Sequence, residues 1–182
     1  MNPLVIGIII VVGFLTAVVL QTIFYFPEPR VSDNVVMILG ENQTFTPATM
    51  SDLKPNSAHL FIYPPKADMS TYNEWLLIRL SEPLGGDKGD ESSLRAYHRL
   101  DLQSWCGVDY WPSRMQLVDP CHGTMYDVIT GIAVDGPAVN LHFQDNALPR
   151  LDLKIIDNFV YVQSPKFTVD ENGVLGYGRI PK

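Results

Sequence analysis

The sequence predicts a mainly β, antiparallel domain behind a single N-terminal transmembrane α-helix. Two observations carry this prediction. Residues 4–26 form one uncharged, apolar stretch, and residues 75–163 contain short apolar runs separated by Gly, Pro, Asn and Asp. Apolar stretches of about 20 residues are typical of membrane-spanning helices, whereas short runs bounded by turn residues are typical of small antiparallel β-domains. Hydrophobic residues make up 46% of the chain, so it is not an intrinsically disordered protein.

The apolar stretch at residues 4–26 has the length of a helix that crosses a hydrocarbon core of about 30 Å. Three aromatic residues, 24–26, stand at its end, where an aromatic belt meets the lipid headgroups, and Pro27 cannot continue a helix. We therefore expect a transmembrane anchor over residues 1–30. A cleaved signal peptide is the alternative, but the first three residues carry no basic side chain and no Ala-x-Ala site follows.

The rest of the chain divides into three parts by composition. We expect a linker with short strands over residues 31–74, a β-domain over 75–163 and a C-terminal extension over 164–182. The apolar runs predict strands at 35–39, 59–63, 75–80, 94–100, 116–118, 129–134, 151–156 and 159–163. Residues 82–93 predict a loop rich in Gly and Asp, and Asn-Gly at 172–173 predicts a hairpin within the extension.

The charge of the chain argues against a nucleic-acid partner. The formal net charge is -7 and the pI about 4.9, whereas phosphates require a basic surface. The sequence contains no Gly-x-Ser-x-Gly, His-Glu-x-x-His or phosphate-loop motif, so nothing in it supports an enzyme. His59, His98 and His142 stand alone among polar neighbours, and we expect them at the surface.

The chain has two cysteines, Cys106 and Cys121, each in a loop rich in Gly and Pro. Behind a membrane anchor, such a pair favours a single disulfide, which requires an oxidising compartment. The β-domain would then lie on the extracytoplasmic side, with the N-terminus on the cytoplasmic side. A reduced structural pair is one alternative. Thiol–disulfide catalysis is another, although the two cysteines do not form a Cys-x-x-Cys pair.

Several motifs around the cysteines follow one another in a fixed order. They are Cys-Gly-Val-Asp-Tyr-Trp at 106–111, Asp-Pro-Cys-His-Gly-Thr-Met-Tyr-Asp at 119–127, Thr-Gly at 130–131 and Gly-Pro-Ala at 136–138. Together with residues 151–163, they resemble the Rieske iron–sulfur domain of cytochrome bc-type complexes. The resemblance implies a Rieske-like antiparallel β-sandwich over residues 75–163, with Cys106 bridged to Cys121. Turns that need permissive backbone geometry are expected at the motif glycines 123, 131 and 136.

Rieske domains hold a two-iron cluster with two Cys and two His ligands. The resemblance places the ligand positions at Asp101, Gln103, Asp119 and His122. Only His122 keeps its ligand type, and both cysteines of the chain stand at the bridge positions. We therefore expect a degenerate site without cluster, metal or other cofactor, in which Asp101 and Asp119 accept backbone N–H bonds in place of sulfur. Tyr126 is expected to pack beneath this site.

The resemblance implies a non-redox subunit with a structural or assembly role in a membrane respiratory or photosynthetic electron-transfer complex. Its expected partners are cytochrome b- or c-type or oxidase subunits and the lipid bilayer, and it is expected to be an accessory subunit rather than an enzyme. One alternative is a divalent metal site built from the four former ligand positions, since oxygen donors with one imidazole suit a hard or borderline ion. Another is a genuine electron carrier with a non-standard ligand set. Trp105, in the first loop, is a candidate for partner contact.

Overall fold

The computed structural model describes residues 34–40, 44–65, 67–141 and 146–163. The chain divides into two compact units, Met1–Ser32 and Asp33–Lys182, and all described residues belong to the second. The predicted anchor over 1–30 and the predicted extension over 164–182 therefore lie outside the described residues. Within the described part of the chain, no helix has the length and apolar character needed to span a membrane.

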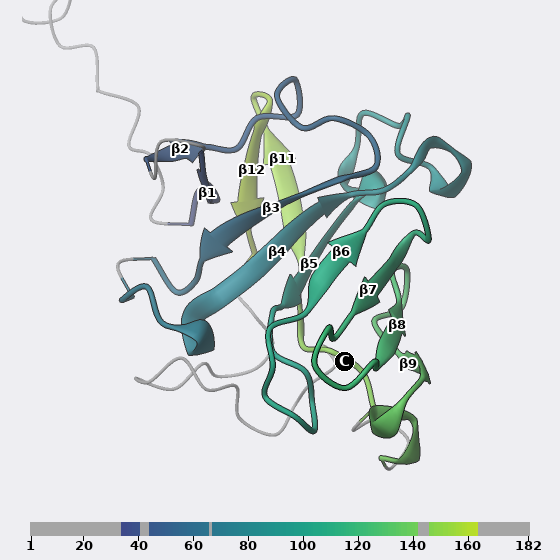
Figure 1. Ribbon diagram of the computed structural model, residues 1–182. Helices are drawn as coiled ribbons and strands as arrows, with labels where there is room; N and C mark the ends of the chain where they lie inside the picture. Colours follow the sequence, from purple (N-terminus) through teal and green to yellow (C-terminus); the bar gives the residue numbers. More distant parts are fainter. Residues whose placement is uncertain (1–33, 41–43, 66, 142–145, 164–182) are drawn as a thin grey trace, which may run out of the picture. The chain divides into compact units, whose positions relative to one another are not determined.

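The described residues form twelve short strands and four 3₁₀ turns (Figure 1). The strands are β1 (Met37–Leu39), β2 (Phe45–Pro47), β3 (Ser57–Ile62), β4 (Glu74–Arg79), β5 (Leu94–His98), β6 (Asp109–Trp111), β7 (Gln116–Val118), β8 (Met125–Asp127), β9 (Ala133–Asp135), β10 (Arg150–Leu151), β11 (Leu153–Ile156) and β12 (Phe159–Val162). The 3₁₀ turns are η1 (Thr71–Asn73), η2 (Glu82–Leu84), η3 (Glu91–Ser93) and η4 (Pro137–Asn140). The predicted mainly β class is confirmed.

The strands build three antiparallel sheets. A six-stranded sheet has the order β10-β5-β4-β3-β1-β2, a four-stranded sheet the order β6-β7-β8-β9, and β11 pairs with β12 in a hairpin. Figure 1 shows the four-stranded sheet as one group of green strands beside β3, β4 and β5. This sheet positions the site described below, because the second cysteine lies in the connection between β7 and β8.

Strand β4 lies at the centre of two apolar layers. Its side chains alternate between them: Trp75 and Leu77 belong to one core cluster, and Leu76 and Ile78 to the other. The first cluster includes buried residues of the β12 strand, and the second includes buried residues of β7 and β8. Successive strand side chains point to opposite faces, so the six-stranded sheet is covered on both sides, as expected of a sandwich.

The strands predicted at 75–80, 94–100, 116–118 and 159–163 are confirmed as β4, β5, β7 and β12. Short strands also occur within residues 31–74, as expected. However, β1, β2 and β3 pair into the same sheet as β4. The sheet therefore continues across the boundary that composition places at residue 75, because a sheet is completed by backbone pairing rather than by local composition.

Two of the predicted strands differ in the structure. The run at 129–134 contributes only its end to β9, because residues 128–130 form a turn. The Asp127 Oδ1 atom closes that turn by accepting the N–H groups of Ile129 and Thr130 at 3.1 and 2.8 Å. The run at 151–156 is divided between β10, which pairs with β5, and β11, which pairs with β12.

His98 is not the surface residue that the sequence predicts. Its side chain is buried at the end of β5, its Nε2 atom lies 2.9 Å from the Tyr72 carbonyl oxygen, and its ring packs edge-on against Trp75. Burial lowers the pKa of His98, and the Tyr72 carbonyl only partly opposes this. A neutral imidazole that donates to this carbonyl therefore fits the core.

Candidate functional site

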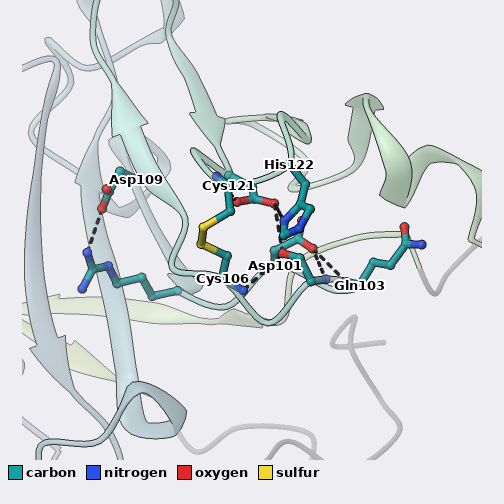
Figure 2. The surroundings of a disulfide bond; sticks show 9 residues. Asp101, Gln103, Cys106, Asp109, Cys121 and His122 are labelled. Atoms are coloured by element: carbon teal, nitrogen blue, oxygen red, sulfur yellow. Dashed lines mark hydrogen bonds and ion pairs between the residues drawn. A yellow bond between two sulfur atoms is a disulfide. The ribbon is translucent and has the colours of Figure 1, made fainter.

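The candidate site lies where two loops are joined by a disulfide (Figure 2). The first loop connects β5 to β6 and the second connects β7 to β8. Cys106 of the first loop is bonded to Cys121 of the second, with Cα atoms 6.4 Å apart. The predicted pairing of the two cysteines is thus present, and the alternative of a reduced pair does not describe this structure.

Arg99 fastens the start of the first loop to the neighbouring strands. Its guanidinium donates to Glu74 Oε2 of β4 at 2.8 Å and to Asp109 Oδ1 of β6 at 2.9 Å. Figure 2 marks the ion pair of Asp109 with a dashed line. These contacts fix both ends of the loop that carries Cys106.

Asp101 is a buried carboxylate whose two oxygens are held by protein donors. Oδ1 accepts the backbone N–H groups of Gln103 at 2.9 Å and Ser104 at 2.6 Å, and Oδ2 accepts the Tyr126 hydroxyl at 2.6 Å. Burial acts to raise the pKa of Asp101. The hydrogen bonds from Tyr126 and the two N–H groups outweigh it, so the pKa lies below its ordinary value.

Tyr126 lies beneath the site, as predicted. It is fully buried in β8, and its hydroxyl accepts the Leu102 N–H at 3.2 Å while donating to Asp101. Burial, followed by the hydrogen bond to the carboxylate, raises the pKa of Tyr126. The phenol therefore stays protonated and acts as a donor to Asp101 throughout the physiological pH range.

Asp119 joins the two loops a second time. It is completely buried, its Oδ1 accepts the Cys121 N–H at 2.8 Å, and its Oδ2 accepts the Ser104 hydroxyl of the first loop at 2.9 Å. The expectation that Asp101 and Asp119 accept backbone N–H bonds is confirmed. His122 Nδ1 lies 3.4 Å from Asp119 Oδ2, and the His122 side chain is 56% exposed.

A small pocket opens at the surface of the two loops. Its volume is about 240 Å³, and its lining residues are Asp101, Gln103, Ser104, His122 and Pro137. The structure thus brings to one pocket three of the four positions that the resemblance assigns to cluster ligands, whereas the fully buried Asp119 is not among the lining residues. Figure 2 shows the Gln103 side chain extending away from the disulfide. The four side chains therefore do not converge on one point.

The donor set does not fit a two-iron Rieske cluster. Such a cluster needs two thiolates and two imidazoles, and the chain has two cysteines, which are bonded to each other. Asp101 already accepts three hydrogen bonds. The residues also do not favour an oxygen-rich divalent metal site. The carboxylates of Asp101 and Asp119 both accept hydrogen bonds from the protein, and the Gln103 side chain extends away from the disulfide.

Two exposed aromatic side chains lie near the disulfide, Trp105 on the first loop and Tyr72 in η1. Trp105 is 58% exposed and stacks edge-on with Tyr72, which is 44% exposed, at a ring-centroid distance of 6.3 Å. A backbone φ of +60° at Trp105 sets the ring at the loop surface. Tyr72 has no distinguishing sequence pattern, so only the structure identifies it.

No family model and no curated protein matches this chain. Solved structures do. The plasma membrane Rieske protein PetC3 from Synechocystis PCC 6803 is 20% identical with a TM-score of 0.46, over 64% of this chain and 95% of that one. The ferredoxin of carbazole 1,9a-dioxygenase from Nocardioides aromaticivorans IC177 is 17% identical with a TM-score of 0.44, over 71% of this chain and 96% of that one.

The quaternary ammonium Rieske monooxygenase CntA is 13% identical with a TM-score of 0.47, over 71% of this chain and 31% of that one. PetC3 and CntA are Rieske proteins by name. The chemistry of this chain follows from its own residues.

Proposed function

We propose that this chain is a cluster-free, non-redox Rieske-like subunit with a structural or assembly role in a membrane electron-transfer complex. One observation carries the proposal: the two sulfurs of the site are bonded to each other, and both buried carboxylates are hydrogen-bonded within the protein. A site arranged in this way holds its two loops together without iron.

Covalent and hydrogen-bonded contacts that need no metal hold the two loops of the site together. The disulfide joins residues 15 positions apart, and closing a loop of this length contributes about 3 kcal/mol in the chain-entropy model. The Ser104–Asp119 hydrogen bond links the same loops, and the Tyr126–Asp101 bond ties the first loop to β8. The loops therefore present one defined surface.

That surface is the proposed contact with a partner subunit. The patch formed by Tyr72 and Trp105 offers exposed aromatic groups, which are enriched in protein–protein interfaces. The proposed partners are cytochrome b- or c-type or oxidase subunits. In this proposal residues 1–30 anchor the chain in the bilayer, the domain lies on the extracytoplasmic side, and the subunit is not itself an enzyme.

Deletion of this subunit from its native membrane tests the proposal. Native electrophoresis should show loss of a membrane complex, while low-temperature electron paramagnetic resonance shows the Rieske-type signals of the membrane unchanged per assembled complex. Reconstitution of a Rieske signal by this chain alone would contradict the proposal.

A matched pair of tryptophan variants tests the partner surface. Trp105→Ala should reduce assembly of the complex, because it removes the centre of the exposed patch. Trp111→Ala is the control: that ring is also exposed, at 38%, but it lies under the Arg114 guanidinium at 5.1 Å rather than in the patch. If the complex assembles equally well with both variants, the patch is not the contact with the partner subunit.

A further inference from the structure

Trp105 lies directly beside a bridged cysteine, whereas Tyr72, the other residue of the exposed patch, does not. We propose that the Cys106–Cys121 bridge is a redox switch for this patch: the oxidised form holds the Trp105 ring against Tyr72, and reduction releases it. This switch rests on the partner contact proposed above and adds its regulation. The release itself is measurable in the isolated chain, so the switch and the partner contact can fail separately.

The backbone of Trp105 has a conformation that a residue with a Cβ atom adopts only under constraint. Its φ of +60° lies in the left-handed region, which lowers the population of an L-residue by a factor of about five to thirty. Residues in such conformations persist where the surrounding structure holds them, and they cluster at binding sites and switch regions. The contacts on either side of Trp105 therefore decide where its ring lies.

A disulfide and a hydrogen bond join the neighbours of Trp105 to the second loop. Cys106 is bonded to Cys121, and the Ser104 hydroxyl donates to Asp119 Oδ2 at 2.9 Å. The same hydroxyl accepts the Cys106 N–H at 3.2 Å. Reduction breaks the covalent link and leaves the hydrogen bonds. A single hydrogen bond between half-buried groups holds a loop far less firmly than a covalent bond, so the segment that carries Trp105 becomes free to relax.

Tyr72 does not depend on the bridge for its position. It lies in η1, directly before β4, and its carbonyl oxygen is 2.9 Å from His98 Nε2. His98 is itself buried and packs edge-on against Trp75. Tyr72 should therefore stay in place when the bridge opens. The ring contact between Tyr72 and Trp105, with centroids 6.3 Å apart, would then be lost through movement of Trp105.

A dithiol is the reductant that this switch requires. Cys121 is exposed and Cys106 is half-buried, so a thiolate can reach the Cys121 sulfur. The dithiol supplies two electrons and two protons, the Cys106–Cys121 bond breaks to two thiols, and the reductant closes to its own cyclic disulfide. An excess of that cyclic disulfide reverses the exchange and closes the bridge again.

Fluorine NMR of the purified full-length chain, labelled with fluorotryptophan, tests the release of Trp105. The chain has three tryptophans, and the Trp105→Phe variant assigns the Trp105 resonance by its loss. Reduction with dithiothreitol should shift or broaden this resonance. The resonance of the buried Trp75 should not move. Trp111 is the matched control, because its ring is also exposed but lies under the Arg114 guanidinium, and its resonance should not move either.

The purified complex tests the consequence for the partner contact. In a dilution series followed by native electrophoresis, dithiothreitol should raise the dissociation constant of this subunit about five- to thirtyfold, the factor by which the left-handed conformation is disfavoured once it is released. Re-oxidation should restore the original value. The double variant Cys106→Ser, Cys121→Ser should bind as weakly as the reduced wild type and should not respond to dithiothreitol.

Three results would overturn the switch. One is an unchanged Trp105 resonance in a chain that titrates with two free thiols. Another is loss of the Trp75 resonance or of the far-ultraviolet circular dichroism on reduction, because the bridge would then hold the whole domain rather than one loop. The third is a dissociation constant that reduction leaves unchanged. If the oxidised subunit forms no complex, the structural role fails, and the fluorine spectrum still decides whether the bridge holds Trp105.

Discussion

Replacing Tyr126 with Phe removes one oxygen atom from beneath the site and leaves the ring in place. Two contacts are lost: the 2.6 Å bond from the hydroxyl to Asp101 Oδ2 and the 3.2 Å bond that the hydroxyl accepts from the Leu102 N–H. Asp101 is only 2% exposed and Tyr126 is fully buried, so water does not readily replace the lost group. Both former partners are left with reduced hydrogen bonding.

The expected loss of unfolding free energy is about 2–4 kcal/mol. A hydrogen bond to a charged group contributes about 1.5–3 kcal/mol, and a buried donor left unpaired costs about 1–3 kcal/mol, with the two effects not fully additive. The loss is expected to depend on pH. The folded pKa of Asp101 lies below its ordinary value of 3.8. Its ionised form therefore stabilises the fold above that value, and this contribution is lost as the pH falls through the folded pKa.

The assay is urea unfolding of the full-length chain in mild detergent, followed by tryptophan fluorescence at pH 7 and at about pH 3. The difference between wild type and Tyr126→Phe should be largest at pH 7 and should shrink toward pH 3. Tyr110→Phe is the matched control, because its hydroxyl donates to the neutral Asn56 Oδ1 at 2.6 Å. It should cost about 0.5–1.5 kcal/mol at both pH values. A Tyr126→Phe effect below about 0.5 kcal/mol, or one equal at both pH values, would refute the assigned role of Asp101.

Three further predictions concern the frame. Gly123→Ala should destabilise the chain by roughly 1–2 kcal/mol in thermal unfolding, because its φ of 77° is positive. Gly136→Ala should destabilise it more, because its φ of 85° is also positive and its added Cβ would lie 2.6 Å from the Thr124 Cα atom. Equal effects of the two substitutions would argue against this close approach. Stability should fall as the pH drops below about 6.5, because burial lowers the folded pKa of His98 and the unfolded chain then binds a proton that the folded chain does not. His98→Gln should flatten that slope in urea titrations at pH 5 to 7, and an unchanged slope would assign it to another group. Cys106→Ser should lower stability by about 2–5 kcal/mol, and a circular dichroism melt that matches wild type would show that the hydrogen bonds alone hold the loops.

The short apolar runs and the turn residues between them were sufficient to predict a mainly β domain, since run length and turn chemistry are local properties. The run at 129–134 shows the limit of this approach. Apolar residues there enter a turn, because the Asp127 carboxylate competes for two backbone N–H groups. The burial of His98 was likewise invisible, because Tyr72 and Trp75 reach it from outside its own strand.

What the sequence determined by itself was the type of donor atom at the positions that the resemblance assigns to iron ligands. Ligation depends on the identity of the donor atom, and identity is readable at Asp101, Gln103 and Asp119 without coordinates. Only the tertiary structure decided what those positions do instead. The Asp101–Tyr126 bond spans 25 positions and the Ser104–Asp119 bond spans 15, and contacts at such separations exist only after the two sheets have packed. Hydrogen bonds between distant residues depend on how the sheets pack, whereas the chemical type of each donor group is fixed by the sequence.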